Sequence, residues 1–127
     1  MRLLLDTHIF LWYISGDSNL PVAYRDLIRD SDNNVFLSVV SVWESIIKYN
    51  LGKLPLASPP ADYLMQQREL HQIQSLPVTE EVLFQLAKLP LLHRDPFDRM
   101  MIAQALHHGL TLVTLDNAIK AYPIPFI

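Results

Sequence analysis

A short run of leucines near the start of the chain constrains the fold more than any other feature. Leu3, Leu4 and Leu5 are consecutive, and the acidic residue Asp6 ends the run. A strand that is apolar at every position is buried on both faces, which is typical of a parallel sheet covered by helices. Arg2–Leu5 is therefore predicted to be an inner strand of an α/β fold.

The rest of the chain alternates between predicted helices and strands. Further strands are predicted at 35–39, 73–78 and 110–114, with a weak one at 124–127. Helices are predicted at 8–15, 21–30, 41–50, 61–71, 80–88 and 95–108, with a short one after Asp116. Such alternation requires crossover connections, which give a mostly parallel sheet. The predicted fold is a single domain over residues 1–127, a three-layer α/β/α sandwich with four to five strands.

Local signals mark the starts of two helices. Ser41-Val42-Trp43-Glu44 matches a capping box, in which Ser41 caps the helix and Glu44 occupies the third position. Asp95 precedes Pro96, a pair that favours the first turn of a helix. Asp95 is therefore the predicted cap of the helix that ends near His108.

Composition limits the classes of protein to be considered. Half of the residues are hydrophobic and 18% are charged, which is typical of a globular domain. The net charge of −3 provides no general attraction to nucleic acid. The absence of cysteine excludes disulfides and thiolate metal sites and suits a reducing compartment. Without a signal peptide or an apolar stretch of roughly 20 residues, we expect a soluble, cytoplasmic protein with no membrane association.

Four acidic residues fall at comparable junctions between strands and helices. Asp6 directly follows the first predicted strand, and Asp116 lies two residues after the strand at 110–114. Glu44 and Asp98 each lie in the predicted first turn of a helix. In a parallel α/β sheet these junctions share the rim where ligands bind, so we expect the four side chains to converge.

Each of these acids also has an ordinary structural explanation. Asp6 suits a helix cap, and Glu44 suits an ion pair with Lys48 one turn later. Asp98 suits the positive end of a helix dipole, and Asp116 suits a turn after a strand. The functional interpretation rests on the four together, because the topology places all of them at one edge.

Electrostatic repulsion explains why such a group would need a cation. Two like charges ~4 Å apart cost about 4 kcal/mol at an effective dielectric constant near 20. Several such pairs would remove a large part of the ~5–15 kcal/mol by which a domain is stable. Either some of the acids are protonated, or a hard divalent cation neutralises them. Mg²⁺ and Mn²⁺ take oxygen ligands, so one or two of these ions are the predicted cofactor.

Histidine and arginine residues give weaker signals. No zinc-site spacing connects the five histidines, which we expect at the surface or at helix ends: His8, His71, His93, His107 and His108. Arg94 and Arg99 flank the turn that contains Asp98. They are candidates for contact with phosphate, with solvated surface charge as the alternative.

Four short motifs together resemble those of PIN-domain nucleases, and more narrowly those of the VapC toxins of bacterial toxin–antitoxin pairs. The motifs are Leu5-Asp6-Thr7-His8, Ser41-Val42-Trp43-Glu44, His93-Arg94-Asp95-Pro96-Phe97-Asp98-Arg99 and Thr114-Leu115-Asp116. The resemblance extends from residue 3 to about residue 122. It depends on the order and spacing of the motifs, since each motif alone is short.

The resemblance implies a ribonuclease with a Mg²⁺- or Mn²⁺-dependent site. The acidic positions of the family correspond to Asp6, Glu44, Asp98 and Asp116. The polar positions that support them correspond to Thr7, Ser41 and Thr114. The resemblance also implies an RNA substrate, a cognate antitoxin that holds the toxin inactive, and a homodimer.

The resulting hypothesis is metal-assisted hydrolysis of an RNA phosphodiester by the toxin of a type II toxin–antitoxin pair. One alternative is an enzyme that transfers a phosphoryl group through an aspartate. It is disfavoured because Asp6 is followed by Thr7 and His8 rather than by a second acid, and because no lysine follows the strand at 110–114 before Lys120. The other alternative is a protein-binding module with structural acids, which predicts no stabilisation by metal.

Overall fold

Four parallel strands form the centre of the molecule, in a computed structural model that describes residues 1–127. They are β1 (Arg2–Leu5), β2 (Asn34–Ser38), β3 (Gln74–Leu76) and β4 (Thr111–Val113), arranged in the order β3-β2-β1-β4. All three neighbouring pairs are parallel. The predicted α/β fold class is confirmed.

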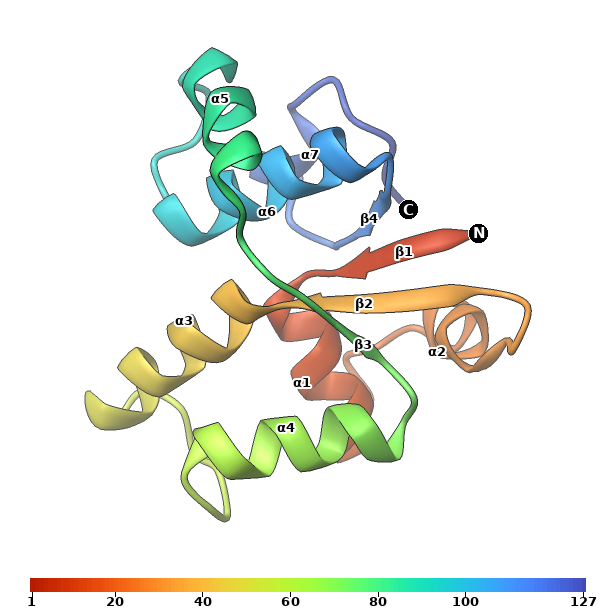
Figure 1. Cartoon of the computed structure of the whole chain (residues 1–127). Coiled ribbons are helices and arrows are strands. Elements are labelled where there is room, and N and C mark those ends of the chain that lie inside the picture. Colours follow the sequence, from red (N-terminus) through yellow and green to blue (C-terminus); the bar gives the residue numbers. More distant parts are fainter.

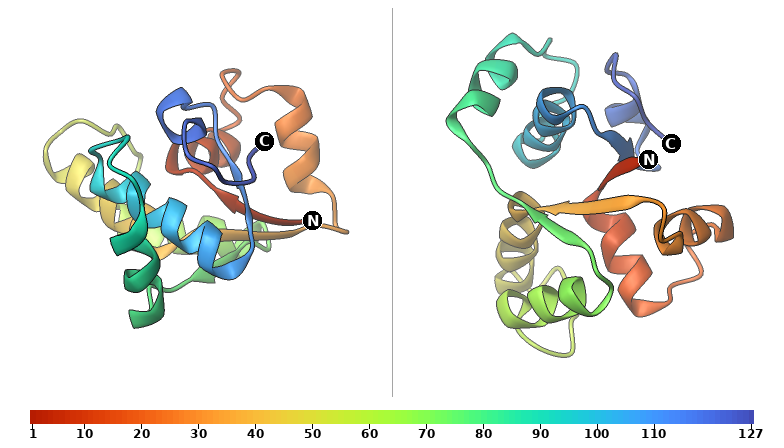
Figure 2. Two further views of the ribbon diagram at one scale, coloured as in Figure 1. Left: turned by 90° about the horizontal axis from the view of Figure 1, so that it is seen from above. Right: turned by 45° about the vertical axis from the view of Figure 1, so that its right-hand side comes forward.

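Helices cover both faces of this sheet (Figures 1 and 2). The helices are α1 (Thr7–Ser15), α2 (Val22–Arg29), α3 (Val39–Asn50), α4 (Pro60–Leu70), α5 (Glu80–Lys88), α6 (Pro96–His108) and α7 (Asn117–Lys120). Helices α1, α2 and α4 lie on one side, and α6 and α7 lie on the other. Helix α3 extends from the end of β2 and contacts α1, α4 and α6. None of the helices has both the length and the apolar character that crossing a membrane requires.

The three leucines of β1 divide between the two cores of the sandwich. Leu3 and Leu5 belong to the cluster under α1 and α2, whereas Leu4 belongs to the cluster with α6 and α7. All three side chains are completely buried. Successive side chains of a strand point to opposite faces, so an unbroken apolar run gives both layers a hydrophobic surface. This confirms the two-sided burial predicted for the strand.

The strand order creates a crevice beside β1. The chain passes from β1 through β2 to β3 on one side, then returns to place β4 on the other side of β1. At such a reversal the loops after the two adjacent strands, here β1 and β4, turn away from each other, which leaves room for a ligand at their carboxyl ends. Asp6 follows β1 and Asp116 follows β4, so two of the four acids flank this crevice.

The start of α3 differs from the predicted capping box. The cap is Ser38, whose Oγ accepts a hydrogen bond of 3.1 Å from the Val40 N–H, and the helix begins at Val39. The predicted cap, Ser41, therefore lies inside the helix. Ser38 is both the last residue of β2 and the cap of α3, so no loop separates the two elements. Val39 and Val40 are β-branched and favour strands, but tertiary packing overrides this preference.

The predicted fifth strand at 124–127 is reduced to one isolated bridge between Leu112 and Phe126. Even so, this segment lies along the open edge of β4. The Leu112 N–H donates to the Pro125 carbonyl at 3.0 Å, and the Ile127 N–H donates to the Leu112 carbonyl at 3.0 Å. The segment therefore satisfies backbone groups that an exposed sheet edge would leave unpaired.

Candidate metal centre

Asp6 and Asp116 lie on the two sides of the crevice. The Asp6 side chain is buried, and its backbone N–H donates to the Val113 carbonyl at 3.0 Å, which extends the β1–β4 pairing to the rim. Asp116 is exposed and caps α7 by accepting from the Ala118 N–H at 2.9 Å. Both acids line a cleft of about 210 Å³, whose other lining residues are His8, Ile9, Trp12 and Leu115.

The hydroxyl group of Thr114 joins these two acids. Thr114 is completely buried, and its Oγ1 donates to Asp6 Oδ2 at 2.9 Å. The same oxygen accepts from the Asp116 N–H at 3.0 Å. One hydroxyl therefore fixes both the Asp6 carboxylate and the backbone at Asp116.

Glu44 lies on the buried face of α3 that it shares with Ser41 and Ser45. Its Oε1 accepts from Thr7 Oγ1 at 2.8 Å, and Thr7 Oγ1 also lies 2.9 Å from the Ser41 Oγ. Its Oε2 is 2.6 Å from Lys48 Nζ. Burial acts to lower the pKa of Lys48, but the hydrogen bond and charge of Glu44 outweigh it and raise that pKa overall. The ion pair expected from the sequence is present, so the charge of Glu44 is compensated.

Asp98 lies in the first turn of α6, where Asp95 already serves as the cap. Asp95 Oδ1 accepts from the N–H groups of Phe97 at 2.9 Å and Asp98 at 3.2 Å. The Asp98 carboxylate is thus directed elsewhere, and its Oδ2 lies 2.7 Å from His93 Nε2. Burial raises the pKa of Asp98 to about 7, against the lowering effect of the His93 hydrogen bond. Asp6, Asp95 and Glu44 add smaller contributions in the same direction as burial.

Asp6 and Asp98 share the property that no lysine or arginine neutralises them. Each is less than 10% exposed, and neither forms an ion pair with a lysine or arginine. Burial also raises the pKa of Asp6, despite the hydrogen bond from Thr114. Buried carboxylates without a charged partner are unfavourable in their ionised form, and a bound cation relieves that cost.

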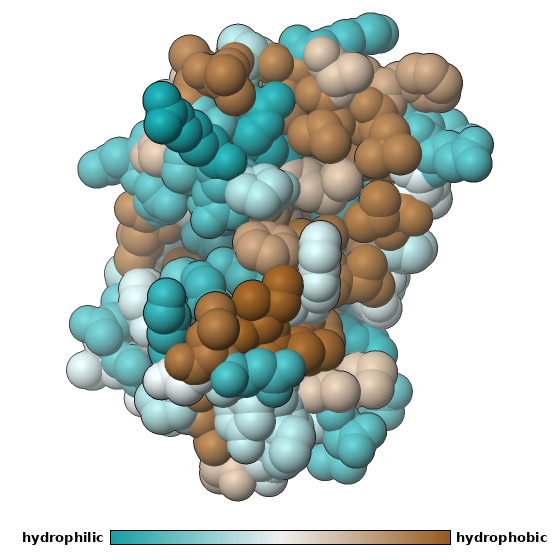
Figure 3. Space-filling view, turned by 90° about the vertical axis from the view of Figure 1, so that its left-hand side faces the viewer, coloured by the Kyte–Doolittle hydropathy of each residue, from teal (hydrophilic) through white to brown (hydrophobic).

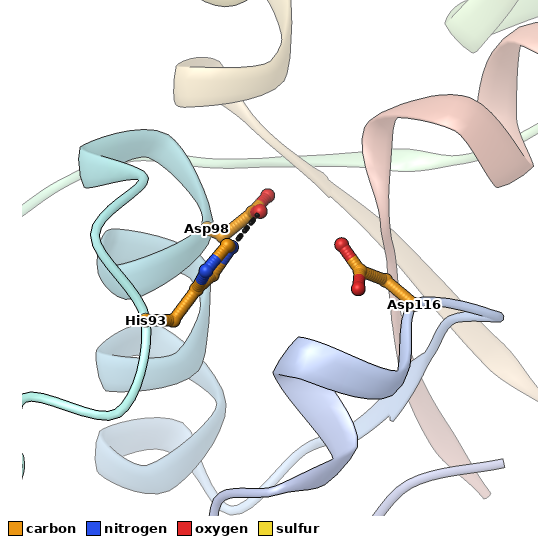
Figure 4. Close-up of side chains that lie close together, drawn as sticks. All are labelled: His93, Asp98 and Asp116. Atoms are coloured by element: carbon orange, nitrogen blue, oxygen red, sulfur yellow. Dashed lines mark hydrogen bonds and ion pairs between the residues drawn. The ribbon is translucent and has the colours of Figure 1, made fainter.

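The side chain of His93 lies close to two of the acids, Asp98 and Asp116. One potential ligand atom from each of His93, Asp98 and Asp116 lies within 4.8 Å of the others. Figure 4 shows His93 approaching Asp98 from the segment before α6, while the Asp116 carboxylate faces them from the segment before α7. No role in the site was predicted for His93. The available signal was its position five residues before Asp98, with the Asp95-Pro96 helix start between them.

This cluster does not extend to Asp6 or Glu44. Asp6 reaches the same region through the cleft that it shares with Asp116 and through the Thr114 hydroxyl. Glu44 lies outside the cluster, and Thr7 and Lys48 bind its two carboxylate oxygens. Oxygen donors from Asp6, Asp98 and Asp116, with an imidazole beside them, form a set that suits a divalent cation.

The two arginines differ in their environments. Arg99 Nη1 donates to the Pro90 carbonyl at 3.0 Å and to Tyr122 Oη at 2.9 Å, so its side chain holds the preceding segment in place. Arg94 is exposed and forms no ion pair. Both line a surface hollow of about 660 Å³ together with Leu86, Ala87, Leu91 and Pro96.

Comparison with known proteins identifies relatives that share this architecture. The chain is 28% identical over 123 residues to Ribonuclease VapC22 of Mycobacterium tuberculosis, an alignment that covers 96% of this chain and 92% of that protein. The solved structure of VapBC2 from Rickettsia felis, bound to a DNA fragment from their promoter, matches with a TM-score of 0.74 and 17% identity, covering 100% of this chain and 98% of that one. FitAcB from Neisseria gonorrhoeae matches with a TM-score of 0.65 and 21% identity, covering 98% and 96%.

The structural matches show the shared fold, and the sequence match shows a distant relationship to the VapC ribonucleases. The family described as PIN domain matches residues 3–125 of this chain. Apart from Arg2, the four-stranded parallel sheet and the acids around its crevice lie within that range. The chain belongs to the PIN-domain family.

Proposed function

We propose that this protein is a metal-dependent ribonuclease and the toxin of a type II toxin–antitoxin pair. Membership of the PIN-domain family and the distant relationship to Ribonuclease VapC22 support this function. The observation that carries the proposal is the pair of buried acids, Asp6 and Asp98, which have no lysine or arginine partner and lie beside the exposed Asp116.

In this proposal Asp6, Asp98 and Asp116 hold one or two Mg²⁺ or Mn²⁺ ions. A bound ion supplies a Lewis acid that activates water and stabilises negative charge developing on the phosphate. Thr114 fixes the orientation of Asp6 through its 2.9 Å hydrogen bond. Glu44 completes the site through water or by orienting the attacking group, because its two oxygens already bond Thr7 and Lys48.

RNA recognition in this proposal depends on local positive charge. The chain carries a net charge of −3, so RNA receives no general attraction from it. The acids would hold a cation that supplies positive charge for a phosphate group. Exposed Arg94, beside the acidic cluster, is the proposed second phosphate contact, whereas the guanidinium of Arg99 already bonds Pro90 and Tyr122.

The proposed protein partners are an antitoxin and a second copy of this chain. Figure 3 shows patches of hydrophobic side chains on one face of the molecule. Large apolar residues exposed on α3 and α4 include Val39, Trp43, Met65 and Leu70. Exposed apolar patches are typical of interaction surfaces, and the VapBC2 and FitAcB structures have this fold.

The decisive experiment measures RNA cleavage by the purified chain freed of any antitoxin. Cleavage should require Mg²⁺ or Mn²⁺, stop on addition of EDTA, and fall by at least a hundredfold in Asp98→Asn. The matched control is Asp32→Asn, which changes an exposed aspartate away from the crevice and should retain activity. Cleavage without metal, or full activity of Asp98→Asn, would contradict the mechanism.

The same preparation tests the two alternatives. Phosphoryl transfer through an aspartate requires an acyl-phosphate on Asp6, which can be trapped chemically and detected by mass spectrometry. A binding module with structural acids requires that Mg²⁺ and Mn²⁺ leave the thermal midpoint unchanged. Burial of Asp6, together with its hydrogen bond from Thr114, supports a fixed ligand more than an attacking nucleophile.

A further inference from the structure

His93 is held in place from two sides, although it lies in a segment without regular secondary structure. Its backbone N–H donates to Tyr122 Oη at 3.0 Å, and its Nε2 lies 2.7 Å from Asp98 Oδ2. Tyr122 is only 2% exposed, so the anchor for the His93 backbone belongs to the hydrophobic core. The imidazole is therefore built into the rim of the sheet.

The buried hydroxyl of Tyr122 collects hydrogen bonds from three donors. Besides the His93 N–H, it accepts from the Leu92 N–H at 3.3 Å and from Arg99 Nη1 at 2.9 Å. Arg99 also donates to the Pro90 carbonyl at 3.0 Å. These bonds connect the segment before α6 to Arg99 in α6 and to Tyr122, two residues after the end of α7. This network therefore limits the positions that the His93 imidazole can occupy.

The spacing of the neighbouring donor atoms matches what a single ion needs. The ligand atoms of His93, Asp98 and Asp116 all lie within 4.8 Å of one another. In octahedral geometry with ligands ~2.1 Å from the ion, adjacent ligands are about 3 Å apart and opposite ones about 4.2 Å apart. Small side-chain rotations would therefore suffice to bring the three atoms into one coordination sphere, with His93 and Asp98 each contacting the ion in place of their mutual hydrogen bond.

We propose that His93 Nε2 is a direct metal ligand and makes this a mixed nitrogen–oxygen site that prefers Mn²⁺ to Mg²⁺. The proposal rests on the metal-dependent function proposed above. A nitrogen ligand favours transition-metal ions, whereas Mg²⁺ takes oxygen ligands and keeps much of its water. The competing arrangement is a His93 that only hydrogen-bonds a ligating Asp98 and orients it.

Metal titrations separate these arrangements without any activity measurement. Calorimetry with Mn²⁺ and with Mg²⁺ should give a higher affinity for Mn²⁺ in the unaltered chain. His93→Ala should lower the Mn²⁺ affinity roughly 10–100-fold and the Mg²⁺ affinity less, so the ratio of the two affinities falls. His107→Ala, an exposed histidine near the far end of α6, should leave both affinities unchanged. An unchanged ratio in His93→Ala overturns the proposal.

Spectroscopy of the unaltered protein gives a second test that does not depend on how a variant folds. Pulsed electron paramagnetic resonance of the bound Mn²⁺ should show coupling to an imidazole ¹⁴N nucleus. That coupling should disappear in His93→Ala and persist in His8→Ala, the histidine that lines the adjoining cleft. Bound Mn²⁺ without nitrogen coupling, or coupling lost only in His8→Ala, overturns the assignment to His93. Failure to bind either ion overturns the proposed metal-dependent function itself.

Discussion

The carboxyl groups of Asp98 and Asp6 are buried, so ionisation of either one changes the free energy of unfolding. Burial raises both pKa values, and that of Asp98 reaches about 7. Since an unfolded aspartate has a pKa of about 3.9, the folded state retains the Asp98 proton over a range in which the unfolded chain has lost it. Protonation of Asp98 therefore stabilises the metal-free fold, and this contribution is lost as the pH rises through about 7.

Replacement of Asp98 by asparagine should reveal this dependence. Metal-free Asp98→Asn should be more stable than the unaltered protein at pH 8, because the variant has no buried charge. At pH 5 the gain in unfolding free energy of the variant over the unaltered protein should be smaller by on the order of 1–3 kcal/mol. The reason is that Asp98 in the unaltered protein is then largely protonated. Urea denaturation at the two pH values measures the difference. An advantage independent of pH would refute the argument.

The hydroxyl of Thr114 positions both the Asp6 carboxylate and the backbone at Asp116. Thr114→Val keeps the shape but removes the bonds to Asp6 Oδ2 and the Asp116 N–H. We expect unfolding free energy to fall by about 1–3 kcal/mol, and metal affinity to fall roughly 10–100-fold. Thr111→Val is the matched control at the start of the preceding strand, β4, since the Thr111 side chain makes no hydrogen bond within the protein. Equal effects of the two substitutions would exclude a positioning role for Thr114.

Among the elements, α6 and α3 show what local sequence can and cannot determine. The start of α6 was predictable because Asp95 and Pro96 act within one turn. The start of α3 was not, because packing decides whether β-branched Val39 continues the strand or opens the helix. The pairing of Glu44 with Lys48 was predictable from helical spacing. The position of His93 beside Asp98 was not predictable, since a distant residue, Tyr122, fixes the His93 backbone.

The cap of α6 should matter to stability and to the metal site together. Asp95→Ala removes the acceptor for the N–H groups of Phe97 and Asp98. We expect a loss of about 1 kcal/mol, with a weaker metal affinity because Asp98 lies in the turn that frays. Asp95→Asn supplies the same acceptor and should restore most of both quantities. Chemical denaturation and calorimetry on the two variants measure the effects, and equal losses in both would show that the cap acts by charge rather than by hydrogen bonding.

At the scale of the whole molecule, the alternation of helices and strands predicts a parallel sheet but not the order of its strands. Parallel pairing and helices on both faces were predictable, because Leu3, Leu4 and Leu5 make β1 apolar on both of its faces. The reversal that places β4 beside β1 depends on long-range packing, which no short motif records. The convergence of Asp6 with Asp116 at one cleft is a product of that reversal.

Binding of metal at this crevice should stabilise the entire domain. Mg²⁺ or Mn²⁺ at ten times its dissociation constant should raise the unfolding free energy by about 1.4 kcal/mol. For a chain of this size the thermal midpoint should rise by roughly 5 °C. Differential scanning calorimetry with and without metal measures the shift, and Asp98→Asn should abolish most of it. A rise that persists in Asp98→Asn would place the stabilising ion elsewhere.

The hydrogen bond between Thr114 and Asp6 joins residues 108 positions apart. During translation, Asp6 leaves the ribosome long before Thr114 is added, so the nascent chain has no assembled site for most of its synthesis. Only when β4 has emerged from the exit tunnel and paired with β1 do the two sides meet. Any activity that depends on this candidate metal centre therefore begins only after β4 has paired with β1.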